Sequence, residues 1–566
     1  MQEKQWIYKE VPLVEKIKTL SKTINVSTPT ACLLLQRSID DFPKAKHFFR
    51  AGLQQLHDPF QMRDMHKAAE RLTEAVQKGQ KILFYGDYDV DGTTSVSLLS
   101  GFFRNQSVPF EFYIPDRYSE GYGLSDKAVT YIIQQNIDLV ITLDCGIKAV
   151  EKIARAKAAG VDFIVCDHHT PGASLPPAFA VLDPKRRDCP YPYKELSGCG
   201  VGFKLLQAYC RLNRIDEREV FKYLDLVAIS IASDIVPITG ENRILARFGL
   251  QQINKEARVG IQALINIAGL RPPLSISGIV FGIGPRINAA GRIGHAKEAV
   301  HLLLSEEEAE AKSLAKSIDT KNEQRKDYDT NTTDEVLAMI EEFGLQNRKT
   351  TVLYNPDWHK GVIGIVASRC IERYYRPTII LTQSQGKITG SARSVENYDI
   401  YTAIEACEDL LEQYGGHKYA AGLTLDQGNL EAFALRFEEV VSQSITQDLL
   451  TPKIYIDLKL SLDQINPNFY QVVQQMAPFG PENMQPVFVS EGVIDSGYAR
   501  VLKDRHLKLK VKQANGQQVL DAIGFNMAGF YPLVASGRPF QVCYSIEENT
   551  YNGRTSLQLM LRDIKG

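Results

Sequence analysis

The sequence has little of what would mark a membrane-bound or secreted protein. Its 566 residues contain no run of about 18 apolar side chains, the length that a membrane-spanning helix needs. The opening stretch "MQEKQWIYKEVP" lacks the apolar core of a secretory signal. We therefore expect a cytoplasmic protein with no membrane partner.

Paired cysteines and a strong net charge are also absent. The nine cysteines are an odd number, and they are scattered with no CxxC pair, which argues against a disulfide framework and a zinc ribbon. The formal net charge is only −2, so a nucleic-acid surface would have to be a local patch. The chain is long enough for roughly three or four domains, and its apolar content of 44% can fill several cores.

Strand-like runs alternate with helix-like ones after a helical segment at residues 1–70. The runs "KILFYGD", "PFEFYIP", "DLVITLD", "DFIVCD" and "FAVLDP" predict an α/β domain with a parallel sheet at 71–300. The charged stretch 301–345 has a helical pattern and predicts a long connecting helix. A smaller α/β unit is expected at 346–450, and the short strands of 451–566 predict a small β-barrel.

The predicted barrel contains one strand with a basic face. In "RVLKDRHLKLKVKQ", Lys508, Lys510 and Lys512 alternate with Leu507, Leu509 and Val511. Because side chains of a strand point alternately to its two faces, the leucine side is expected to be buried and the lysine side solvated. An ordinary solvated strand explains this pattern as well as a nucleic-acid surface does.

The stretch "YGDYDVDGTT" places Asp87, Asp89 and Asp91 at every second position behind an apolar run. Carboxylates this close repel one another unless a cation lies among them. A calcium EF-hand loop is excluded, because its twelfth position, which requires a bidentate Glu, is Leu98 and the preceding segment is strand-like. A carboxylate-rich loop at the end of a strand in an α/β sheet fits better.

Two further strand-like runs end in aspartate, at Asp144 in "ITLDCGI" and at Asp167 in "VCDHHT". The latter continues with His168 and His169, and Asp234 lies in "AISIASDIVP". Carboxyl ends of parallel strands meet at one edge of a sheet, so we expect these groups to share a crevice. Carboxylate oxygens suit Mg²⁺ and Mn²⁺, and added imidazole shifts the preference towards Mn²⁺.

The "DHHT" stretch resembles the signature of the DHH phosphoesterases. "DYDVDG", "LDCGI" and "ASDIVP" are similar to other motifs of that family, in the same order, and "GGHKYAAGL" is similar to its DHHA1 domain. "PDRYSEGYGL", "LSGCGVGFKL", "FGIGPRINAAGRIGHA", "WHKGVIGIVASR" and "APFGPENMQPVF" resemble the RecJ family of bacterial single-strand-specific DNA exonucleases, from about residue 70 to the C-terminus. Cys199, Gly202 and Ala392 depart from the family pattern without removing a ligand.

The resemblance implies a two-ion centre with Mn²⁺ or Mg²⁺ and a phosphate-binding region. The implied catalytic residues are Asp89, Asp91, Asp144, His168, His169 and Asp234, and the implied metal ligands are Asp87, Asp89, Asp91, Asp144, Asp167, His168 and Asp234. The implied substrate-binding residues are Arg117, Arg286, Arg292, Ser391, Arg393 and His417. The barrel would be an oligonucleotide-binding (OB) fold.

The function implied by this resemblance is 5′-to-3′ degradation of single-stranded DNA to 5′-mononucleotides, in DNA repair and recombination. A single-stranded-DNA-binding protein and a helicase are the implied partners. One alternative is a DHH-family phosphodiesterase for very short oligonucleotides (nanoRNA), although such enzymes need no barrel. The other is a non-catalytic replication scaffold, which the full set of acidic and histidine residues disfavours.

Overall fold

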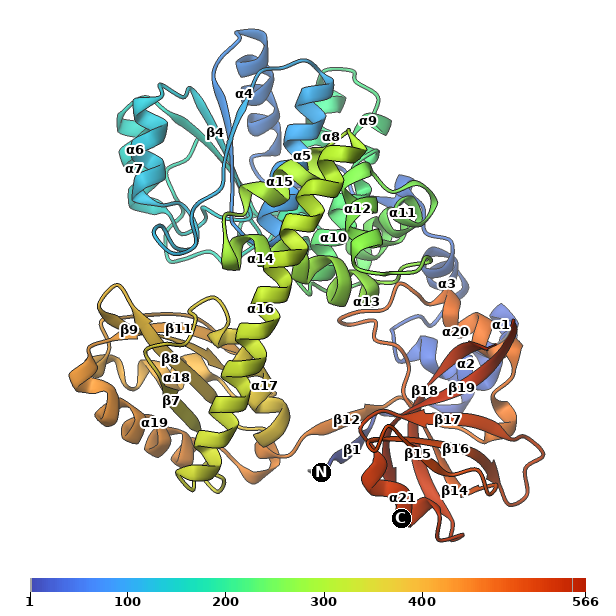
Figure 1. Cartoon of the computed structure of the whole chain (residues 1–566). Helices are drawn as coiled ribbons and strands as arrows, with labels where there is room; N and C mark the ends of the chain where they lie inside the picture. Colours follow the sequence, from blue (N-terminus) through green and yellow to red (C-terminus); the bar gives the residue numbers. More distant parts are fainter. Residues whose placement is uncertain (1–2, 552) are drawn as a thin grey trace.

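The computed structural model describes residues 3–551 and 553–566. Figure 1 shows an α/β domain at the top, a second α/β unit at the lower left and a β-barrel at the lower right, with the long helix α16 between the first two. All nine cysteines are unpaired and buried. Among the helices in the described ranges, none combines the length and the apolar character needed to cross a bilayer.

The first domain is built on a five-stranded sheet in the order β3-β2-β4-β5-β6, with every neighbouring pair parallel. Its strands are Ile82–Gly86 (β2), Glu111–Tyr113 (β3), Leu139–Leu143 (β4), Asp162–Cys166 (β5) and Ala180–Leu182 (β6). The parallel sheet predicted from the alternating runs is confirmed. Strands β2 and β4 are buried along their whole length, as expected for a sheet covered on both faces.

Alternate residues of the central strands enter two separate cores. Phe84 and Ile141 belong to the core under helices α4, α5, α8 and α10, whereas Tyr85 and Val140 belong to the core under α6 and α7. These helices are Met65–Gln77 (α4), Val90–Asn105 (α5), Asp126–Gln134 (α6), Val150–Ala158 (α7), Gly198–Leu212 (α8) and Leu224–Ser233 (α10). Most of the remaining elements of this domain are also helical: Arg218–Phe221 (α9), Gly240–Glu256 (α11), Val259–Ile267 (α12), Ile276–Gly278 (α13), Ile279–Ile283 (η3), Gly284–Ile293 (α14) and Lys297–Leu304 (α15).

The strand order places a crevice at the carboxyl edge of this sheet. The chain runs from β2 outward to β3, and then returns to the other side of β2 to form β4. Such a reversal opens a crevice between the two strands, where ligands of α/β proteins bind. Asp87 follows β2, Asp144 follows β4 and Asp167 follows β5, so the three strand-end acids lie along this edge.

Helix α16, Glu308–Glu342, connects the first domain to the second and enters the core of each. Ala311, Ala315 and Ile318 pack into the first domain's core, and Val336 and Ile340 pack against Trp358 in the second. Its 35 residues span about 50 Å at 1.5 Å per residue. Because side chains near each end pack into one of the two cores, the helix sets the position of the second domain relative to the first.

The second α/β unit has a mixed sheet in the order β10-β11-β9-β8-β7. The strands are Thr351–Tyr354 (β7), Thr378–Ser384 (β8), Lys387–Arg393 (β9), Gln413–His417 (β10) and Ala420–Leu425 (β11), and the helices are Ile363–Tyr374 (α17), Ile400–Glu405 (α18) and Leu430–Ser444 (α19). Ser391 and Arg393 are two residues apart on β9, so their side chains share the face opposite buried Ala392.

The C-terminal unit is a closed barrel. Strand β14 pairs with both β18 and β16, which closes the series β14-β18-β19-β17-β16 into a ring. The strands are Leu458–Lys459 (β13), Phe488–Asp495 (β14), Arg500–Leu502 (β15), His506–Gln513 (β16), Leu520–Gly524 (β17), Phe540–Tyr551 (β18) and Arg554–Lys565 (β19), and the helices are Pro467–Gln475 (α20) and Tyr531–Val534 (α21). On β16 the leucine side is buried and the lysine side partly exposed, as predicted.

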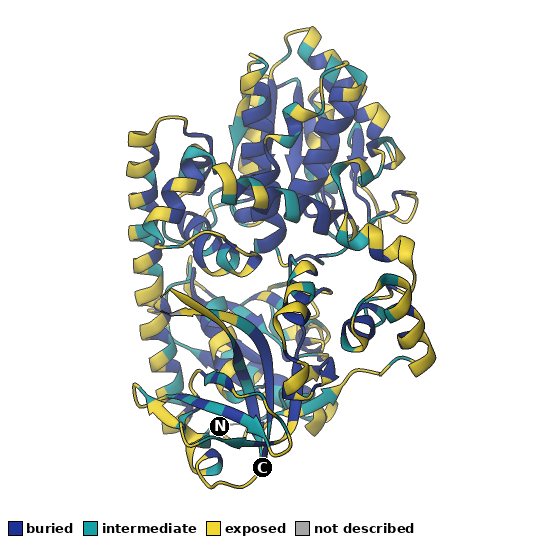
Figure 2. Cartoon of the chain, turned by 90° about the vertical axis from the view of Figure 1, so that its right-hand side faces the viewer, coloured by how far each residue is buried: buried dark blue, intermediate teal, exposed yellow. Residues whose placement is uncertain are grey.

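The N-terminal segment packs against this barrel. Strand β1 (Gln5–Tyr8) pairs in parallel with β12 (Lys453–Ile456), although more than 440 residues separate them in sequence. Helices Val14–Ile24 (α1), Thr28–Leu35 (α2) and Phe42–Phe49 (α3) contribute to the barrel's hydrophobic core, and their buried faces are visible in Figure 2. The sequence predicted a helical segment here but gave no sign of the strand pairing.

Candidate metal centre and phosphate pocket

The first acidic loop is held by hydrogen bonds from its own backbone. Asp89 is the N-cap of α5, and its Oδ1 accepts a hydrogen bond from the Gly92 amide at 3.1 Å. A side chain at Gly92 would lie 2.4 Å from the Asp87 carbonyl oxygen, so the loop can close this tightly only with glycine there. Asp87 Oδ1 accepts from the Tyr88 amide, whereas Asp87 Oδ2 is buried without any hydrogen-bond partner.

Asp91, in the first turn of α5, lies against the N-terminus of helix α8. Its carboxylate accepts hydrogen bonds from the amides of Gly198 at 2.7 Å and Cys199 at 2.8 Å, and from Ser230 Oγ at 2.7 Å. These three donors compensate for the burial of the carboxylate oxygens. A side chain at Gly198 would lie 2.6 Å from the Cβ atom of Asp144, so glycine allows α8 to approach both acids.

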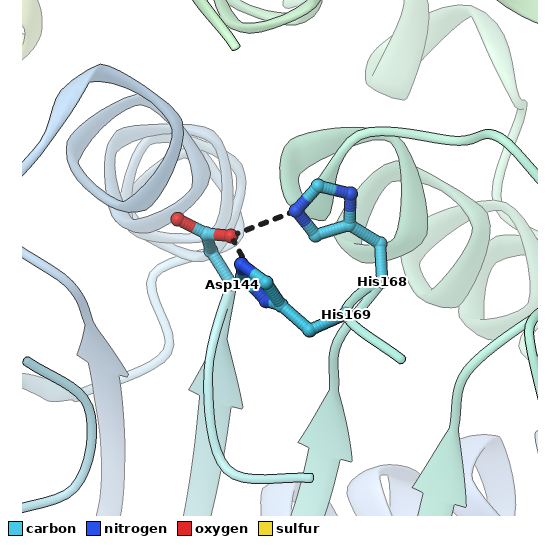
Figure 3. A group of neighbouring side chains, drawn as sticks. All are labelled: Asp144, His168 and His169. Atoms are coloured by element: carbon cyan, nitrogen blue, oxygen red, sulfur yellow. Dashed lines mark hydrogen bonds and ion pairs between the residues drawn. The ribbon is translucent and has the colours of Figure 1, made fainter. Parts of the chain in front are cut away.

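Asp144, His168 and His169 converge at the carboxyl ends of β4 and β5 (Figure 3). His168 Nε2 lies 3.1 Å from Asp144 Oδ1, 3.7 Å from Asp91 Oδ2 and 3.6 Å from Asp234 Oδ2. His169 Nδ1 lies 4.0 Å from Asp144 Oδ1. Asp144 has a φ of 61°, an unfavourable conformation for a residue with a side chain, and such strain is typical of functional positions.

Two groups of side chains in this crevice have the spacing of metal ligands. Asp144, His168 and His169 form one group, and Asp91, His168 and Asp234 form the other. An imidazole nitrogen holds one ion at a time, so His168 can serve only one of the two groups. Asp87 and Asp89 supply further carboxylates in the same loop, although neither belongs to these two groups.

Asp167 orients its neighbours and is not a member of either group. Its Oδ1 accepts hydrogen bonds from the His168 amide, the His169 amide and His169 Nδ1, and its Oδ2 accepts from the Ile147 amide at 2.9 Å. The carboxylate is therefore occupied by donors from the chain. It holds the His169 ring in place, as acidic partners commonly do for histidines at metal sites.

The charges of the crevice are unbalanced in the absence of a cation. Burial, followed by repulsion from Asp91 and Asp89, raises the pKa of Asp144 well above its usual range. Burial likewise raises the pKa values of Asp87, Asp89 and Asp234, with further contributions from neighbouring acids. Burial lowers the pKa of His168, which favours the neutral imidazole that a metal requires.

Asp167 and His169 behave as an ion pair beside these acids. Burial alone would raise the pKa of Asp167, but the hydrogen bond and charge of His169, the charge of His168 and the Ile147 amide together outweigh it and lower that pKa to about 2. Burial opposes protonation of His169, but its hydrogen bond to Asp167 raises its pKa. The contact with Asp167 thus favours protonation of the His169 ring at the rim of the crevice.

The donor set of the crevice fits a divalent cation. Asp87 Oδ2 and His168 Nδ1 are buried and lack hydrogen-bond partners, although buried polar atoms are normally paired. Several buried carboxylates and a neutral imidazole suit Mn²⁺ or Mg²⁺, whereas the thiol of Cys145 is buried and its raised pKa disfavours the thiolate that zinc would bind.

A cationic pocket of about 410 Å³ lies between the first domain and the second α/β unit. Arg117, Arg292, Ser391 and Arg393 line it, and Arg393 Nη1 donates to Ser391 Oγ at 3.0 Å. None of these three arginines forms an ion pair with any residue that the structure describes. Burial, followed by repulsion from Arg117, Arg393 and Arg325, lowers the pKa of Arg292 to about 9. Such a cluster of cations is suited to an anion.

Two predicted substrate-binding residues lie outside this pocket. Arg286 donates through Nε to Asp319 Oδ1 on α16 at 2.8 Å and through Nη1 to the Gly282 carbonyl, so it joins the connecting helix to the first domain. His417 is exposed at the end of β10. Burial and the positive charges of Lys148, His169 and Lys185 lower the pKa of His417, which indicates that it faces the crevice from the second domain.

Sequence reasoning missed two tyrosines of the pocket. The guanidinium of Arg117 lies 4.7 Å from the ring centre of Tyr88, and the Tyr122 hydroxyl lies 3.1 Å from His169 Nε2. Both tyrosines line the pocket, between the cationic cluster and the metal crevice. Their positions inside "YGDYDVDG" and "SEGYGL" were the signal that could have identified them.

Comparisons with known proteins identify one family along most of the chain. Residues 81–231 match the DHH family N-terminal domain, residues 347–443 the DHHA1 domain and residues 456–563 the RecJ OB domain. The single-stranded-DNA-specific exonucleases RecJ of Bacillus subtilis and Escherichia coli are 35% and 34% identical, over 98% and 89% of this chain and 70% and 90% of theirs.

Solved structures agree with this assignment. The crystal structure of RecJ in complex with Mn²⁺ from Thermus thermophilus has a TM-score of 0.86 and 28% identity, over 99% of this chain and 79% of that one. The complex of the same protein with Mg²⁺ gives a TM-score of 0.80. The shared domains, the extent of identity and the common fold together establish that the chain belongs to the RecJ family of DHH proteins.

Proposed function

We propose that this chain is a metal-dependent exonuclease that degrades single-stranded DNA and acts in DNA repair and recombination. One observation carries the proposal: a crevice of carboxylates and histidines lies beside a pocket of arginines that form no ion pairs with the residues the structure describes. Its relatives include single-stranded-DNA-specific exonucleases, and a related structure contains Mn²⁺. A phosphodiester chain is the substrate that needs both features.

The proposed ligands are Asp89, Asp91, Asp144, His168 and Asp234, with Asp87 close by. Two bound ions, Mn²⁺ or Mg²⁺, would activate a water and neutralise charge on the attacking and leaving oxygens. The amides of Gly198 and Cys199 hold the Asp91 carboxylate in place, and Asp167 orients His169. His169 then contributes a positive charge to the scissile phosphate.

The cationic pocket suggests the direction of degradation. A terminal 5′-phosphate held by Ser391 and Arg393 would place the first phosphodiester bond over the crevice. A pocket that ends behind the terminal phosphate admits one nucleotide beyond the cut, so the product is a 5′-mononucleotide. The width between the two domains would then be suited to one strand.

The two alternatives fit less well. A phosphodiesterase for very short oligonucleotides has no use for the closed barrel, which is joined to the N-terminal helices by a common core. A non-catalytic scaffold would not need buried, mutually repelling carboxylates, which reduce stability in the absence of a cation. A single-stranded-DNA-binding protein, a helicase, a cytoplasmic location and the five-segment division of the chain stay predictions.

The activity can be tested with end-labelled substrates. Single-stranded DNA should be degraded in Mn²⁺ or Mg²⁺, double-stranded DNA and RNA should be degraded much less, and excess EDTA should stop the reaction reversibly. The expected product of a 5′-labelled strand is the labelled mononucleotide from the first time point. Full activity in EDTA, or a ladder of shortening 5′-labelled fragments, would contradict the proposal.

The basic face of β16 is expected to bind the strand backbone. Replacing Lys508, Lys510 and Lys512 with alanine should weaken binding to single strands. The slope of the logarithm of the binding constant against the logarithm of salt concentration should become shallower by up to about 2, because three phosphate contacts are lost. Titration of labelled DNA at several salt concentrations measures both effects. Point variants are preferable to deletion of the barrel, because deletion would expose the apolar faces of α1 and α2.

A matched control is the triple alanine variant of the exposed Lys16, Lys18 and Lys22 on α1, which removes the same charge. It should leave the salt slope close to that of the parent. Equal slopes for the parent and the β16 variant would reject a contact between this face and the strand.

A further inference from the structure

The loop at residues 114–125 connects β3 to α6 and carries two side chains of the cationic pocket. Arg117 and Tyr122 line that pocket, and the Tyr122 hydroxyl lies 3.1 Å from His169 Nε2. Residues 114–125 all lie outside helices and strands, and the backbone has a φ of 81° at Gly121. Ordering such a segment costs conformational entropy, so contacts other than a regular backbone ladder must hold it.

Glu120 gathers hydrogen-bond donors from both ends of this loop. Its Oε2 accepts from the Tyr113 hydroxyl at 2.9 Å and from Ser125 Oγ at 2.6 Å, and its Oε1 accepts from the Asp116 amide at 3.0 Å. Tyr113 is the last residue of β3, and Ser125 is the N-cap of α6. One carboxyl group thereby joins the strand, the loop and the helix.

The Glu120 carboxyl group is enclosed by the loop and turned away from the pocket. Its side chain is 3% exposed, and the ammonium of Lys127, on a side chain that is 70% exposed, lies 3.9 Å away. An ion pair this long and this exposed contributes little, so the three hydrogen bonds compensate for the burial. The lining of the cationic pocket, as the structure describes it, includes Arg117 and Tyr122 but not Glu120.

Contacts to Glu120 determine the backbone on both sides of Arg117. The Glu120 amide donates to the Asp116 carbonyl at 3.0 Å, in return for the bond from the Asp116 amide to the Glu120 side chain. Asp116 Oδ1 in turn accepts from the amides of Tyr118 at 3.1 Å and Ser119 at 2.8 Å. Loss of the Glu120 carboxyl group would release the start of this turn and, with it, the base of the Arg117 side chain.

The same loop also contacts the second domain. The Tyr118 hydroxyl donates to the Arg292 carbonyl, and Gln385 Nε2 donates to the Tyr118 carbonyl at 3.3 Å. Arg292 lines the cationic pocket beside Arg117. A displaced loop would therefore disturb the arrangement of the pocket where the two domains meet.

We propose that Glu120 is a positioning residue for the terminal nucleotide: it holds the 114–125 loop so that Arg117 lines the cationic pocket and Tyr122 lies beside His169. This inference rests on the proposed exonuclease function and adds to it a residue that need not touch the substrate. Placement matters for rate, because a displacement of about 1 Å at a group that binds substrate can cost a factor of about 100.

Replacing Glu120 with alanine should lower kcat/KM on 5′-phosphorylated single strands by roughly 10- to 100-fold, as a misplaced binding group does. The preference for a 5′-phosphate over a 5′-hydroxyl end should fall as well, because Arg117 is displaced. Glu120→Gln should keep most of both. Its side-chain oxygen can accept from the Asp116 amide, and its nitrogen can donate to the two hydroxyl groups that now donate to the carboxyl group.

A double-mutant cycle distinguishes positioning from a general loss of stability. If Glu120 acts through Arg117, adding Glu120→Ala to Arg117→Ala should leave the remaining phosphate preference unchanged, so the two effects are not additive. The matched control is Glu438→Ala, which removes a carboxylate of the second domain that accepts from the amides of Lys349 and Thr350, each at 3.0 Å. This control should lower the melting temperature and leave the phosphate preference at the value of the parent.

Hydrogen exchange measures the loop without any reaction. The backbone amides of residues 114–125 should exchange faster in Glu120→Ala than in the parent, and at the rate of the parent in Glu120→Gln. Tyr113→Phe removes one of the three donors and keeps the ring that stacks on Tyr85. It should change exchange and phosphate preference in the same direction by a smaller amount, which provides a test if the alanine variant does not fold.

The outcomes also distinguish this inference from the function on which it rests. A parent protein that neither binds nor degrades single strands would reject the proposed exonuclease, and the positioning role with it. An active parent whose Glu120→Ala variant keeps the phosphate preference would reject the positioning role alone. Effects of Glu120→Ala and Arg117→Ala that add in full would do the same, because Glu120 would then act independently of Arg117.

Discussion

Replacing Asp144 with asparagine should lower kcat/KM on single-stranded DNA by roughly a thousandfold or more, because the change removes charge from the centre of the ligand set. Asp144 lies 3.1 Å from His168 and belongs to one of the two ligand groups. Steady-state kinetics in saturating Mn²⁺ measure the effect. Turnover close to that of the parent would show that Asp144 is not a ligand.

The same variant should be more stable than the parent when metal is absent. The pKa of Asp144 in the folded protein is raised above the ordinary value of 3.8, so ionisation destabilises the fold. The stabilisation that comes from keeping the Asp144 carboxyl protonated is fully present below about pH 4, and it is lost as the pH rises through the raised pKa. As the pH rises over this range, the melting temperature of the metal-free parent should therefore fall more than that of Asp144→Asn. Added Mn²⁺ should raise the melting temperature of the parent more than that of the variant.

Arg393→Ala should remove most of the preference for a 5′-phosphorylated strand. The parent is expected to favour 5′-phosphate over 5′-hydroxyl DNA by about 10- to 100-fold, the value of a charge-assisted contact to a buried anion. Burial and the charge of Arg117 lower the pKa of Arg393, so an anion there relieves an unfavourable arrangement. The ratio of kcat/KM for the two substrates measures the preference, and kcat/KM for the hydroxyl strand should change little.

Two further variants sharpen this test. Arg393→Lys keeps the charge without the planar fork and should retain part of the preference. Arg436→Ala removes an exposed arginine of the same domain, whose nearest acid is Asp409 at 3.8 Å, and should retain all of it. Degradation from the 3′ end by the parent, or an unchanged preference in Arg393→Ala, would contradict the proposed polarity.

Local patterns in the sequence were enough to predict the architecture of the first domain. Apolar runs that end in Asp87, Asp144 and Asp167 specify buried strands with acids after them, and parallel strands bring those ends to one edge. Alternation on β16 likewise predicted its buried and solvated faces. Such features depend on residues close in sequence, because successive side chains of a strand point to opposite faces.

The partners of individual side chains could not be predicted in this way. Asp167 accepts hydrogen bonds from its neighbours, and Arg286 pairs with Asp319 on α16. Neither contact was predicted from the sequence, and the metal role expected of Asp167 and the substrate role expected of Arg286 stay predictions. A side chain at a strand end or on a helix can turn to several neighbours. Packing of the surrounding segments decides which neighbour is within reach.

Assembly of distant segments was likewise decided only by the tertiary structure. The pairing of β1 with β12 and the cationic pocket between two domains both join residues far apart in the chain. The sequence by itself determined the strands, their acidic ends and the family motifs, because these are encoded locally. Only the folded chain decided which charges remain unpaired and which apolar groups remain exposed, because both depend on what packs against them.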